Sequence, residues 1–258
     1  MIEPEGFDVD RLHVVVHADE AALARAAADE AAGCIRAAVA ERGVAHAMLA
    51  TGNSQLRFID SLVADTPDVP WSRVVVFHMD EYVGVGPDDP AGFRRWIRER
   101  IGDRVRARAV HYLDGLADPV AECGRYAALL QAHPLDLCCL GIGENGHLAF
   151  NDPPVADFTD PLDVKVVELD RACRLQQVGE GHFPNVDAVP TFAMTVTVPA
   201  LLRARTVLAV VPEGRKAAAV GAALEGPVST ACPASALRTA QRAILHLDPG
   251  SAHGLAGR

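Results

Sequence analysis

Four short polar segments of the sequence carry residue types that could bind an anion or move a proton. They are Thr51-Gly52-Asn53-Ser54 and residues 77–82, 141–154 and 211–216, and each follows an apolar run typical of a buried strand. Glycines in such segments allow close approach of the backbone to a ligand. Hydroxyl, carboxylate, imidazole and ammonium groups supply the chemistry. The four segments together indicate one candidate site for a small charged molecule.

Two of the segments could bind an anion. Residues 51–54 combine a strand end, a glycine turn and a helix start, and backbone N–H groups at a helix N-terminus bind anions. The alternative is an ordinary turn in which Ser54 caps the next helix. Lys216 is expected in the first turn of another helix, where the helix end already favours negative charge. Only Lys165 and Lys216 are lysines among 24 basic residues, so this placement indicates a bound anion.

Asp80 and His147 are the candidates for proton transfer. Asp80 comes just after an apolar strand, where a carboxylate that faces a cleft can act as a general base; capping of the next helix is its alternative role. His147 is the only side chain of residues 141–154 that titrates near neutral pH. Glu144 and Asp152 flank it and could orient its ring or shift its pKa. This combination suits a phosphorylated small molecule that undergoes proton transfer.

The elements that must position these residues alternate between strands and helices. Strands are expected at residues 12–16, 44–50, 74–77, 136–140, 164–169, 191–196, 207–211 and 243–247. Helices are expected at 19–42, 55–63, 92–101, 117–131 and 214–224, with a helical turn at 199–203, loops at 78–91 and 176–188 and a loose tail at 249–258. The pattern predicts one α/β domain over residues 1–258, doubly wound and Rossmann-like. Its mostly parallel sheet is covered by helices on both faces. Ligands bind such sheets at the carboxyl ends of strands, where the four segments fall.

The composition excludes several classes of protein. A net charge of −10 over 258 residues argues against nucleic acid or an anionic membrane as the main partner. No apolar run approaches the length of a membrane helix, and the first residues lack a signal-peptide pattern, so we expect a cytoplasmic protein. The six cysteines include no CxxC pair and are expected to be buried free thiols. No HExxH motif is present, and we expect no metal site.

Taken in order along the chain, these segments resemble the glucosamine-6-phosphate deaminase family, in the wider group that also holds 6-phosphogluconolactonase. The resemblance covers residues 12–248. The matching motifs are Thr51-Gly52, Met79-Asp80-Glu81-Tyr82-Val83-Gly84, Gly146-His147-Leu148-Ala149-Phe150-Asn151, Val189-Pro190 with Ala193-Met194-Thr195-Val196, and Lys216-Ala217. Lactonases typically have a threonine after the loop histidine and a DER-type acidic motif. MDEYVG and GHLAFN therefore favour the deaminase.

The resemblance implies an enzyme of amino-sugar metabolism. Its reaction is an aldose–ketose isomerisation of an amino-sugar phosphate that releases ammonia and gives fructose 6-phosphate, with no metal or organic cofactor. The resemblance implies that Asp80 moves a proton between C2 and C1 and that His147 opens the sugar ring. Thr51, Gly52 and Lys216 would hold the phosphate. The implied partner is a small-molecule sugar phosphate, and the oligomeric state is open between a monomer and a homo-oligomer.

The residues around the histidine depart from the family pattern. Asn145 stands where the family usually has an aspartate, and Asp152 stands where it usually has a glutamate. An amide forms hydrogen bonds but carries no negative charge, so we expect it to stabilise a protonated His147 less well. Glu144 is a candidate to compensate. Asn145, Asp152 and Glu144 are therefore counted with Asp80 and His147 as candidate catalytic residues.

The phosphate-binding arginine of the family is also missing. Residues 180–183 occupy its stretch without an arginine, and Arg174 is the nearest candidate. Loss of a bidentate contact to phosphate is a large change for a binding site. Two alternative functions therefore stand beside the deaminase: a lactonase-type hydrolase in which His147 activates water, and a non-catalytic sugar-phosphate-binding protein.

Overall fold

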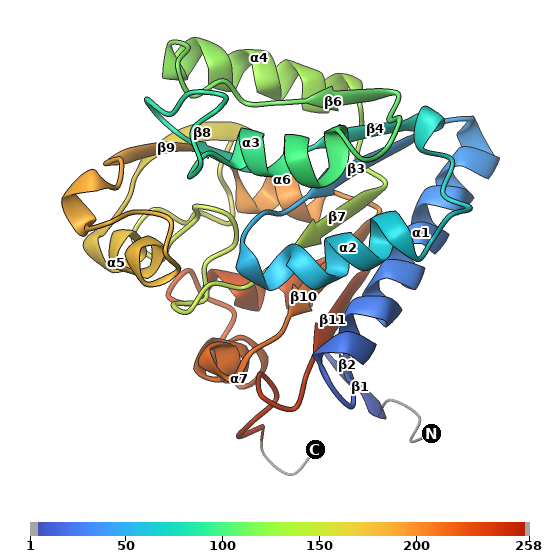
Figure 1. Ribbon diagram of the computed structural model, residues 1–258. Helices are drawn as coiled ribbons and strands as arrows, with labels where there is room; N and C mark the ends of the chain where they lie inside the picture. Colours follow the sequence, from blue (N-terminus) through green and yellow to red (C-terminus); the bar gives the residue numbers. More distant parts are fainter. Residues whose placement is uncertain (1–4, 256–258) are drawn as a thin grey trace.

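The computed structural model describes residues 5–255, and its largest element is an eight-stranded sheet (Figure 1). The strand order is β1-β2-β11-β10-β7-β3-β4-β6, and all neighbours are parallel except the edge pair β1 and β2. The strands are β1 (Glu5–Val9), β2 (Leu12–Val16), β3 (Ala45–Leu49), β4 (Val74–Phe77), β6 (Ala109–His111), β7 (Leu137–Leu140), β10 (Thr206–Val211) and β11 (Ala243–Leu247). Strands β1 and β6 were not predicted.

Helices cover both faces of this sheet, which confirms the predicted α/β fold class. The helices on the parallel sheet are α1 (Glu20–Arg42), α2 (Leu56–Ala64), α3 (Phe93–Ile97), α4 (Pro119–Ala132), α6 (Val198–Leu202) and α7 (Ala217–Glu225), and α5 (Arg171–Gly179) lies elsewhere. One apolar cluster joins the sheet to α1, α2 and α3, and another joins it to α4, α6 and α7. Successive residues of β7 alternate between the two clusters, because side chains of a strand point to opposite faces.

Shorter helical turns join these elements. They are η1 (Asn53–Gln55), η2 (Trp71–Arg73), η3 (Arg98–Gly102), η4 (Val186–Ala188), η5 (Gly214–Lys216) and η6 (Pro233–Thr239). Turn η3 is π-helical and continues α3, so the helix predicted at residues 92–101 changes its winding halfway. No helix within residues 5–255 is both long and apolar enough to cross a membrane. All six cysteines are free thiols, as predicted, but Cys34 and Cys232 are only half-buried, whereas the other four are buried.

Helix α1 shows how the sequence sets an element and its packing. Asp19 starts the helix by accepting a hydrogen bond from the N–H of Ala22 at 2.7 Å. Gly43 ends it in the left-handed conformation, with φ of 78°, and its N–H donates to Val39. Alanine dominates the buried side, and these small side chains let the helix lie close to β3, β10 and β11. The predicted helix at residues 19–42 is therefore confirmed.

A second sheet corrects two predictions. Strands β5 (Asp80–Tyr82), β8 (Val164–Glu168) and β9 (Phe192–Val196) form a three-stranded antiparallel sheet in the order β5-β9-β8. The segment predicted as a loop at 78–91 therefore begins with a strand, and the strands predicted at 164–169 and 191–196 lie outside the parallel sheet. Pairing with β9 satisfies the backbone of β5, whose residues are all buried.

Helix α5 corrects another prediction, because it covers the first part of the loop expected at 176–188. Asp170 starts the helix by accepting a hydrogen bond from the N–H of Cys173 at 2.6 Å. Cys173 joins a small apolar cluster with Tyr82, Phe150 and neighbouring side chains of the second sheet. The helix therefore packs on the second sheet rather than on the parallel one, and Figure 1 shows it beside β8 and β9.

Candidate active site

A cleft with a cavity volume of about 80 Å³ brings residues of all four polar segments together. It lies where β3, β4, β7 and β10 end, which is where ligands bind open α/β sheets. The predicted site residues that line it are Thr51, Gly52, Asn53, Ser54, Asp80, His147 and Lys216. Asp152, Asn145 and Glu144 do not line it. The structure therefore separates side chains that can touch a ligand from side chains that support them.

The turn at residues 51–54 closes one part of the cleft. Gly52 has φ of 99°, a conformation that glycine adopts more easily than other residues, and it precedes η1. No side chain caps η1 or α2. The alternative role of Ser54 as a helix cap is therefore wrong, because Ser54 lies inside η1. Its hydroxyl accepts a hydrogen bond from Gln55 at 3.2 Å.

Lys216 presents an unpaired cation to the same cleft. The residue is 4% exposed and lies at the end of η5, the turn that follows β10. It forms no ion pair or hydrogen bond with another side chain in the part of the chain that the structure describes. Burial lowers the pKa of Lys216, although the nearby Glu180 carboxylate acts in the opposite direction. A buried ammonium without a partner is unfavourable in isolation, which indicates that an anionic ligand completes it.

Asp80 is a buried carboxylate that reaches the cleft from β5. Asp80 is 6% exposed, and its Oδ1 atom has no hydrogen-bond partner among the described residues. Burial, and secondarily the Glu81 carboxylate, raise the pKa of Asp80 well above its ordinary value. A carboxylate with a raised pKa is a stronger base once it is ionised. The environment of Asp80 therefore suits a general base.

Glu81 performs the capping role that was the alternative for its neighbour. Its carboxylate accepts hydrogen bonds from the backbone N–H groups of Tyr82, Phe93 and Arg94, at 2.9, 3.1 and 2.6 Å. Phe93 and Arg94 begin α3, whose preceding residue offers no side-chain cap. Adjacent residues of a strand point to opposite sides. The strand β5 therefore directs Asp80 to the cleft and Glu81 to the helix.

His147 and Asp152 form a buried pair. The Nδ1 atom of His147 lies 3.0 Å from Oδ1 of Asp152. Burial by itself would raise the pKa of Asp152, but the contacts with His147 and Asn145 outweigh it, so that pKa lies below its ordinary value. The carboxylate therefore stays ionised and favours the imidazole tautomer with a proton on Nδ1. Nε2 is then free to act on a ligand.

Asn145 supports this pair from behind. Its Nδ2 donates a hydrogen bond to Oδ1 of Asp152 at 2.7 Å, and its Oδ1 accepts one from the backbone N–H of His147 at 3.0 Å. The amide therefore orients the carboxylate and the loop, and it contacts the backbone of the histidine. The donor group of Asn145 suits an ionised Asp152, whereas a second carboxylate at the same place would repel it.

Gly143 is required by the position of the histidine ring. A Cβ atom on Gly143 would lie 2.1 Å from Cε1 of His147, far inside contact distance. The N–H of Gly143 donates to the carbonyl of His147 at 3.0 Å, so the backbone closes around the ring. The absence of a side chain at this residue therefore fixes where the imidazole can lie.

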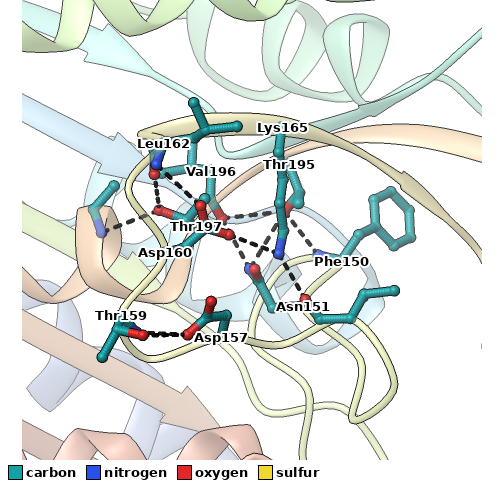
Figure 2. A network of polar contacts seen from close by, with 12 residues as sticks. Phe150, Asn151, Asp157, Thr159, Asp160, Leu162, Lys165, Thr195, Val196 and Thr197 are labelled. Carbon is teal, nitrogen blue, oxygen red and sulfur yellow. Dashed lines mark hydrogen bonds and ion pairs between the residues drawn. The ribbon is translucent and has the colours of Figure 1, made fainter.

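Strand β9 contacts both segments that carry the candidate proton-transfer residues, Asp80 and His147. Asn151 donates from Nδ2 to the carbonyls of Leu148 and Val196, both at 2.8 Å, and Figure 2 shows this network with Thr195. The Thr195 hydroxyl accepts the N–H of Phe150 at 3.1 Å. Thr195 is also the partner of Asp80 in the β5–β9 ladder. One strand therefore positions both Asp80 and the loop that carries His147.

The second lysine of the chain has a structural role. Lys165 donates to the carbonyl of Val155 at 2.6 Å and forms an ion pair with Asp160 at 2.8 Å (Figure 2). Both groups belong to the segment that follows the histidine loop, and Lys165 does not line the cleft. Its position on β8 ties this segment to the second sheet.

Two candidates from the sequence lie away from the cleft. Glu144 is 44% exposed at its side chain and pairs with Arg215 at 3.3 Å, and no contact joins it to His147 among the described residues. Arg174 donates to the carbonyls of Val186 and Val189 at 2.6 and 3.0 Å. Arg174 therefore stabilises the turn after α5 and does not replace the missing phosphate-binding arginine.

The sequence did not predict the side of the cleft that α5 and the turn after it form. Gln176, Gln177, Glu180 and His182 all line the cleft. The available signal was Asp170 as a helix cap and Gly181 as a helix stop on either side of this segment.

Residues 5–255 contain no group of three or more His, Cys, Asp or Glu side chains placed to bind a metal ion.

The fold and the cleft define an α/β protein with a small-molecule site at the carboxyl edge of a parallel sheet. Residues 18–162 match the family described as glucosamine-6-phosphate isomerases/6-phosphogluconolactonase. The chain belongs to this family. The resemblance predicted from the motifs is therefore confirmed.

Known relatives support this assignment along most of the chain. A glucosamine-6-phosphate deaminase of Exiguobacterium sibiricum is 34% identical over 207 residues, 79% of each chain. One of Bacillus thuringiensis strain Al Hakam is 35% identical over 191 residues, 74% of this chain and 70% of the relative. A solved monomeric glucosamine-6-phosphate deaminase is 29% identical with a TM-score of 0.84, covering 93% of this chain and 98% of its own. A 6-phosphogluconolactonase of Shewanella baltica, 21% identical with a TM-score of 0.74 over 91% and 96% of the two chains, shares the fold.

Proposed function

We propose that this protein is a glucosamine-6-phosphate deaminase: it converts the amino-sugar phosphate and water to fructose 6-phosphate and ammonia. The observation that carries the proposal is a buried carboxylate, Asp80, with a raised pKa in the same cleft as the unpaired Lys216 and as His147, which Asp152 contacts from outside the cleft. A base, an orientable imidazole and an anion-binding end are the three parts that this reaction needs. The deaminase relatives at 34–35% identity support the same substrate.

Ring opening is assigned to His147. Its Nε2 takes the proton of the C1 hydroxyl and returns a proton to the ring oxygen, which breaks the bond between C1 and that oxygen and forms the C1 aldehyde. Asp152 holds the proton of Nδ1 and stabilises the imidazolium that forms between the two transfers. Asn145 keeps the carboxylate in place. The aldehyde then makes the neighbouring C2 proton acidic.

Proton transfer from C2 to C1 is assigned to Asp80. The ionised carboxylate removes the C2 proton, and the C1 oxygen takes a proton from the neighbouring ammonium of the substrate, which gives an enolamine. The carboxyl group then returns its proton to C1, which gives a protonated imine at C2. Water adds to this imine, and the C–N bond breaks to release ammonia and leave the ketose. A raised pKa lets the same carboxyl group accept the proton and keep it between the two carbons.

The phosphate is assigned to the other end of the cleft. Lys216 supplies a buried ammonium, and the turn at residues 51–54 supplies hydroxyl, amide and backbone N–H donors. A dianionic phosphate would satisfy the cation that has no partner in the described part of the chain. Binding energy at this end would hold C1 and C2 next to Asp80 and His147.

Ammonia release from purified protein tests the proposal. Glucosamine 6-phosphate is compared with galactosamine 6-phosphate and with unphosphorylated glucosamine, and Asp80→Asn is the matched variant. We expect ammonia only from an amino-sugar phosphate and a loss of about 10²–10⁴-fold in kcat for the variant. Unchanged turnover in Asp80→Asn would refute the mechanism. Hydrolysis of 6-phosphogluconolactone without ammonia release would assign the cleft to a lactonase, and ligand binding without turnover would assign it to a sensor.

We also propose a cytoplasmic location, a small-molecule partner, a single domain and a monomeric state for this protein. The six free cysteines and the net charge of −10 support a cytoplasmic protein whose partner is a small molecule rather than nucleic acid or a membrane. The second sheet is formed by segments between strands of the large sheet, which supports a single domain. One solved relative is a monomeric deaminase, which supports a monomer over a homo-oligomer.

A further inference from the structure

The anion end of the cleft is short of positive charge. Lys216 is the only lysine or arginine among the described residues that line the cleft, and the ionisable groups on the α5 side are Glu180 and His182. A phosphate monoester carries a charge of about −1.5 to −2 near pH 7, because its second pKa is about 6. One lysine does not balance this charge, least of all with a carboxylate nearby.

A hydrogen-bonded turn after α5 sets the position of His182. Gly181, with φ of 83°, ends α5, and its N–H donates to the carbonyl of Val178 at 3.0 Å. The N–H of His182 donates to the carbonyl of Gln177 at 3.1 Å. These two hydrogen bonds form a Schellman turn, which reverses the chain and carries His182 back to the cleft. The imidazole therefore reaches the cleft from a defined turn and not from a free loop.

Aromatic packing fixes this turn against the second sheet. The ring of Phe183 packs edge-on against Tyr82, with centroids 5.3 Å apart, and the Tyr82 hydroxyl donates to Oε1 of Gln177 at 2.8 Å. Tyr82 belongs to β5, the strand that also carries Asp80. The turn is thus attached to the element that positions the proposed base, and the position of His182 is set relative to Asp80.

Glu180 stands beside the imidazole as a counter-ion. Its Oε2 lies 3.5 Å from Nε2 of His182, an atom that is buried and has no hydrogen-bond partner among the described residues. Gln176 and Arg215 hold the Oε1 atom of Glu180 at 2.9 and 3.3 Å. Burial alone would raise the pKa of Glu180, but His182, Gln176, Lys216 and Arg215 together lower it to about 2. The carboxylate is therefore ionised throughout the physiological range.

An ionised carboxylate at this end repels a bound phosphate unless a cation lies between them. A neutral imidazole does not supply that cation, whereas an imidazolium does and donates from both ring nitrogens. It can therefore bond to Glu180 with one nitrogen and to a ligand oxygen with the other. The turn, the counter-ion and the unpaired lysine together describe a site that gains its second positive charge only when the ring binds a proton.

We propose that His182, in its protonated form, is the second phosphate-binding cation of this cleft. It replaces the phosphate-binding arginine that is missing from residues 180–183. The inference rests on the proposed function, because it uses the same cleft and a phosphorylated sugar. It adds that recognition of the phosphate depends on pH through the state of one side chain. A phosphate monoester is bound more tightly when the imidazole carries a proton than when it is neutral.

Other charged groups lie at or near this end of the cleft, and their effect on binding must be distinguished from that of His182. They are Arg215 and Lys216 on η5, Glu144 and His147 on the loop after β7, Glu213 before η5, and Asp80 on β5. Their titration is common to the wild type and to variants at residue 182. A comparison between those variants therefore isolates the contribution of His182.

Binding of glucitol 6-phosphate by calorimetry between pH 6 and pH 8.5 tests the proposal. This ligand has no carbonyl group and cannot be turned over, and unphosphorylated glucitol is the ligand control. The proteins are the wild type, His182→Arg, which carries a permanent charge, and His182→Gln, which carries none. At pH 6 we expect the wild type to bind about tenfold more tightly than His182→Gln. At pH 8.5 the two are expected to converge, while His182→Arg keeps its affinity.

The proposal is overturned if the wild type and His182→Arg show the same dependence on pH, since the titration of the ligand is shared by both. It is also overturned if His182→Gln binds as well as the wild type at pH 6. A thermal melt of each variant checks folding, and His182→Asn replaces any variant that does not fold. Ammonia release is measured in parallel. Release with pH-independent binding refutes only this inference, whereas pH-dependent binding without release refutes only the proposed function.

Discussion

Asp80→Asn is expected to make the protein more stable and far less active. The residue is 6% exposed, and its Oδ1 atom has no partner in the described part of the chain. Asparagine has nearly the same shape but carries no charge, so it keeps the packing of β5 on β9. The substitution therefore removes an unfavourable buried charge while it removes the proposed base.

The size of the gain follows from the isolation of the carboxylate. A buried polar atom without a partner destabilises a protein by about 1–3 kcal/mol, and more when the group is charged. Part of this penalty stays, because the asparagine amide also lacks partners. We therefore expect the free energy of unfolding to rise by about 1–2 kcal/mol at pH 8. For a chain of this size, the melting temperature should rise by about 2–4 °C for each kcal/mol.

The gain in stability of Asp80→Asn is expected to increase with pH. The pKa of Asp80 is raised in the folded state above its unfolded value of about 3.9. The native state therefore holds a proton that the unfolded state has lost, and stability falls as the pH rises from the unfolded pKa through the folded pKa. Below the unfolded pKa the side chain is neutral in both states. The advantage of asparagine is expected to be near zero at pH 4 and to grow toward pH 8.

Asp152→Asn is the matched control, because its pKa is shifted the other way. Contacts with His147 and Asn145 hold the pKa of Asp152 below its ordinary value, against the effect of burial. Its carboxylate therefore stabilises the fold above the unfolded pKa, and this contribution is lost as the pH falls through the folded pKa. Asp152→Asn is expected to destabilise the protein at pH 8 and to match the wild type toward pH 3.

Urea unfolding at a series of pH values, with ammonia release measured at pH 8, distinguishes these outcomes. Both variants should lose most of their activity, so activity alone does not separate the two roles. A lower stability of Asp80→Asn at pH 8, or a gain of equal size at pH 4 and pH 8, would show that burial of the charge is not what distinguishes Asp80. The assignment of Asp80 as the base would then lack its physical support.

Gly143→Ala is expected to lower kcat by about 100-fold with little change in melting temperature, because the new Cβ would displace the ring of His147; ammonia release and a thermal melt test this. Lys216→Met is expected to raise KM for the phosphorylated substrate by about 10–100-fold. The same variant should raise the free energy of unfolding, since it removes a buried, unpaired ammonium; urea unfolding without ligand measures this. Asn151→Ala is expected to reduce the free energy of unfolding by about 1–3 kcal/mol in urea, because it removes two buried hydrogen bonds from Nδ2 to the carbonyls of Leu148 and Val196.

The parallel sheet and its helices could be predicted because their signals are local. Asp19 and Gly43 mark the two ends of α1, and the apolar runs of β7 and β10 are short and uninterrupted. Strand β5 could not be predicted in the same way. It has three residues of mixed polarity, and its hydrogen bonds go to β9, which lies far away in the sequence. Pairing of this kind leaves no local pattern.

The site was predicted in part for the same reason. Residue type and position at a strand end were enough to select Asp80, His147 and Lys216, all of which line the cleft. The direction of the Asn145 side chain, toward Asp152 rather than toward the imidazole, depends on the path of the loop and could not be read from spacing. His182 was overlooked because an arginine was expected at that stretch, and its place depends on the turn after α5.

The two ends of the cleft belong to different sheets, and this has a consequence for selectivity. Lys216 and the turn at residues 51–54 follow strands of the large sheet, whereas Asp80 belongs to the small one. If the proposed roles hold, the distance between the two sheets sets the number of carbon atoms between the phosphate and the reacting carbons. A shorter sugar phosphate would then reach only one of the two ends. Repacking between the sheets could therefore change the length of sugar accepted without altering any residue that touches it.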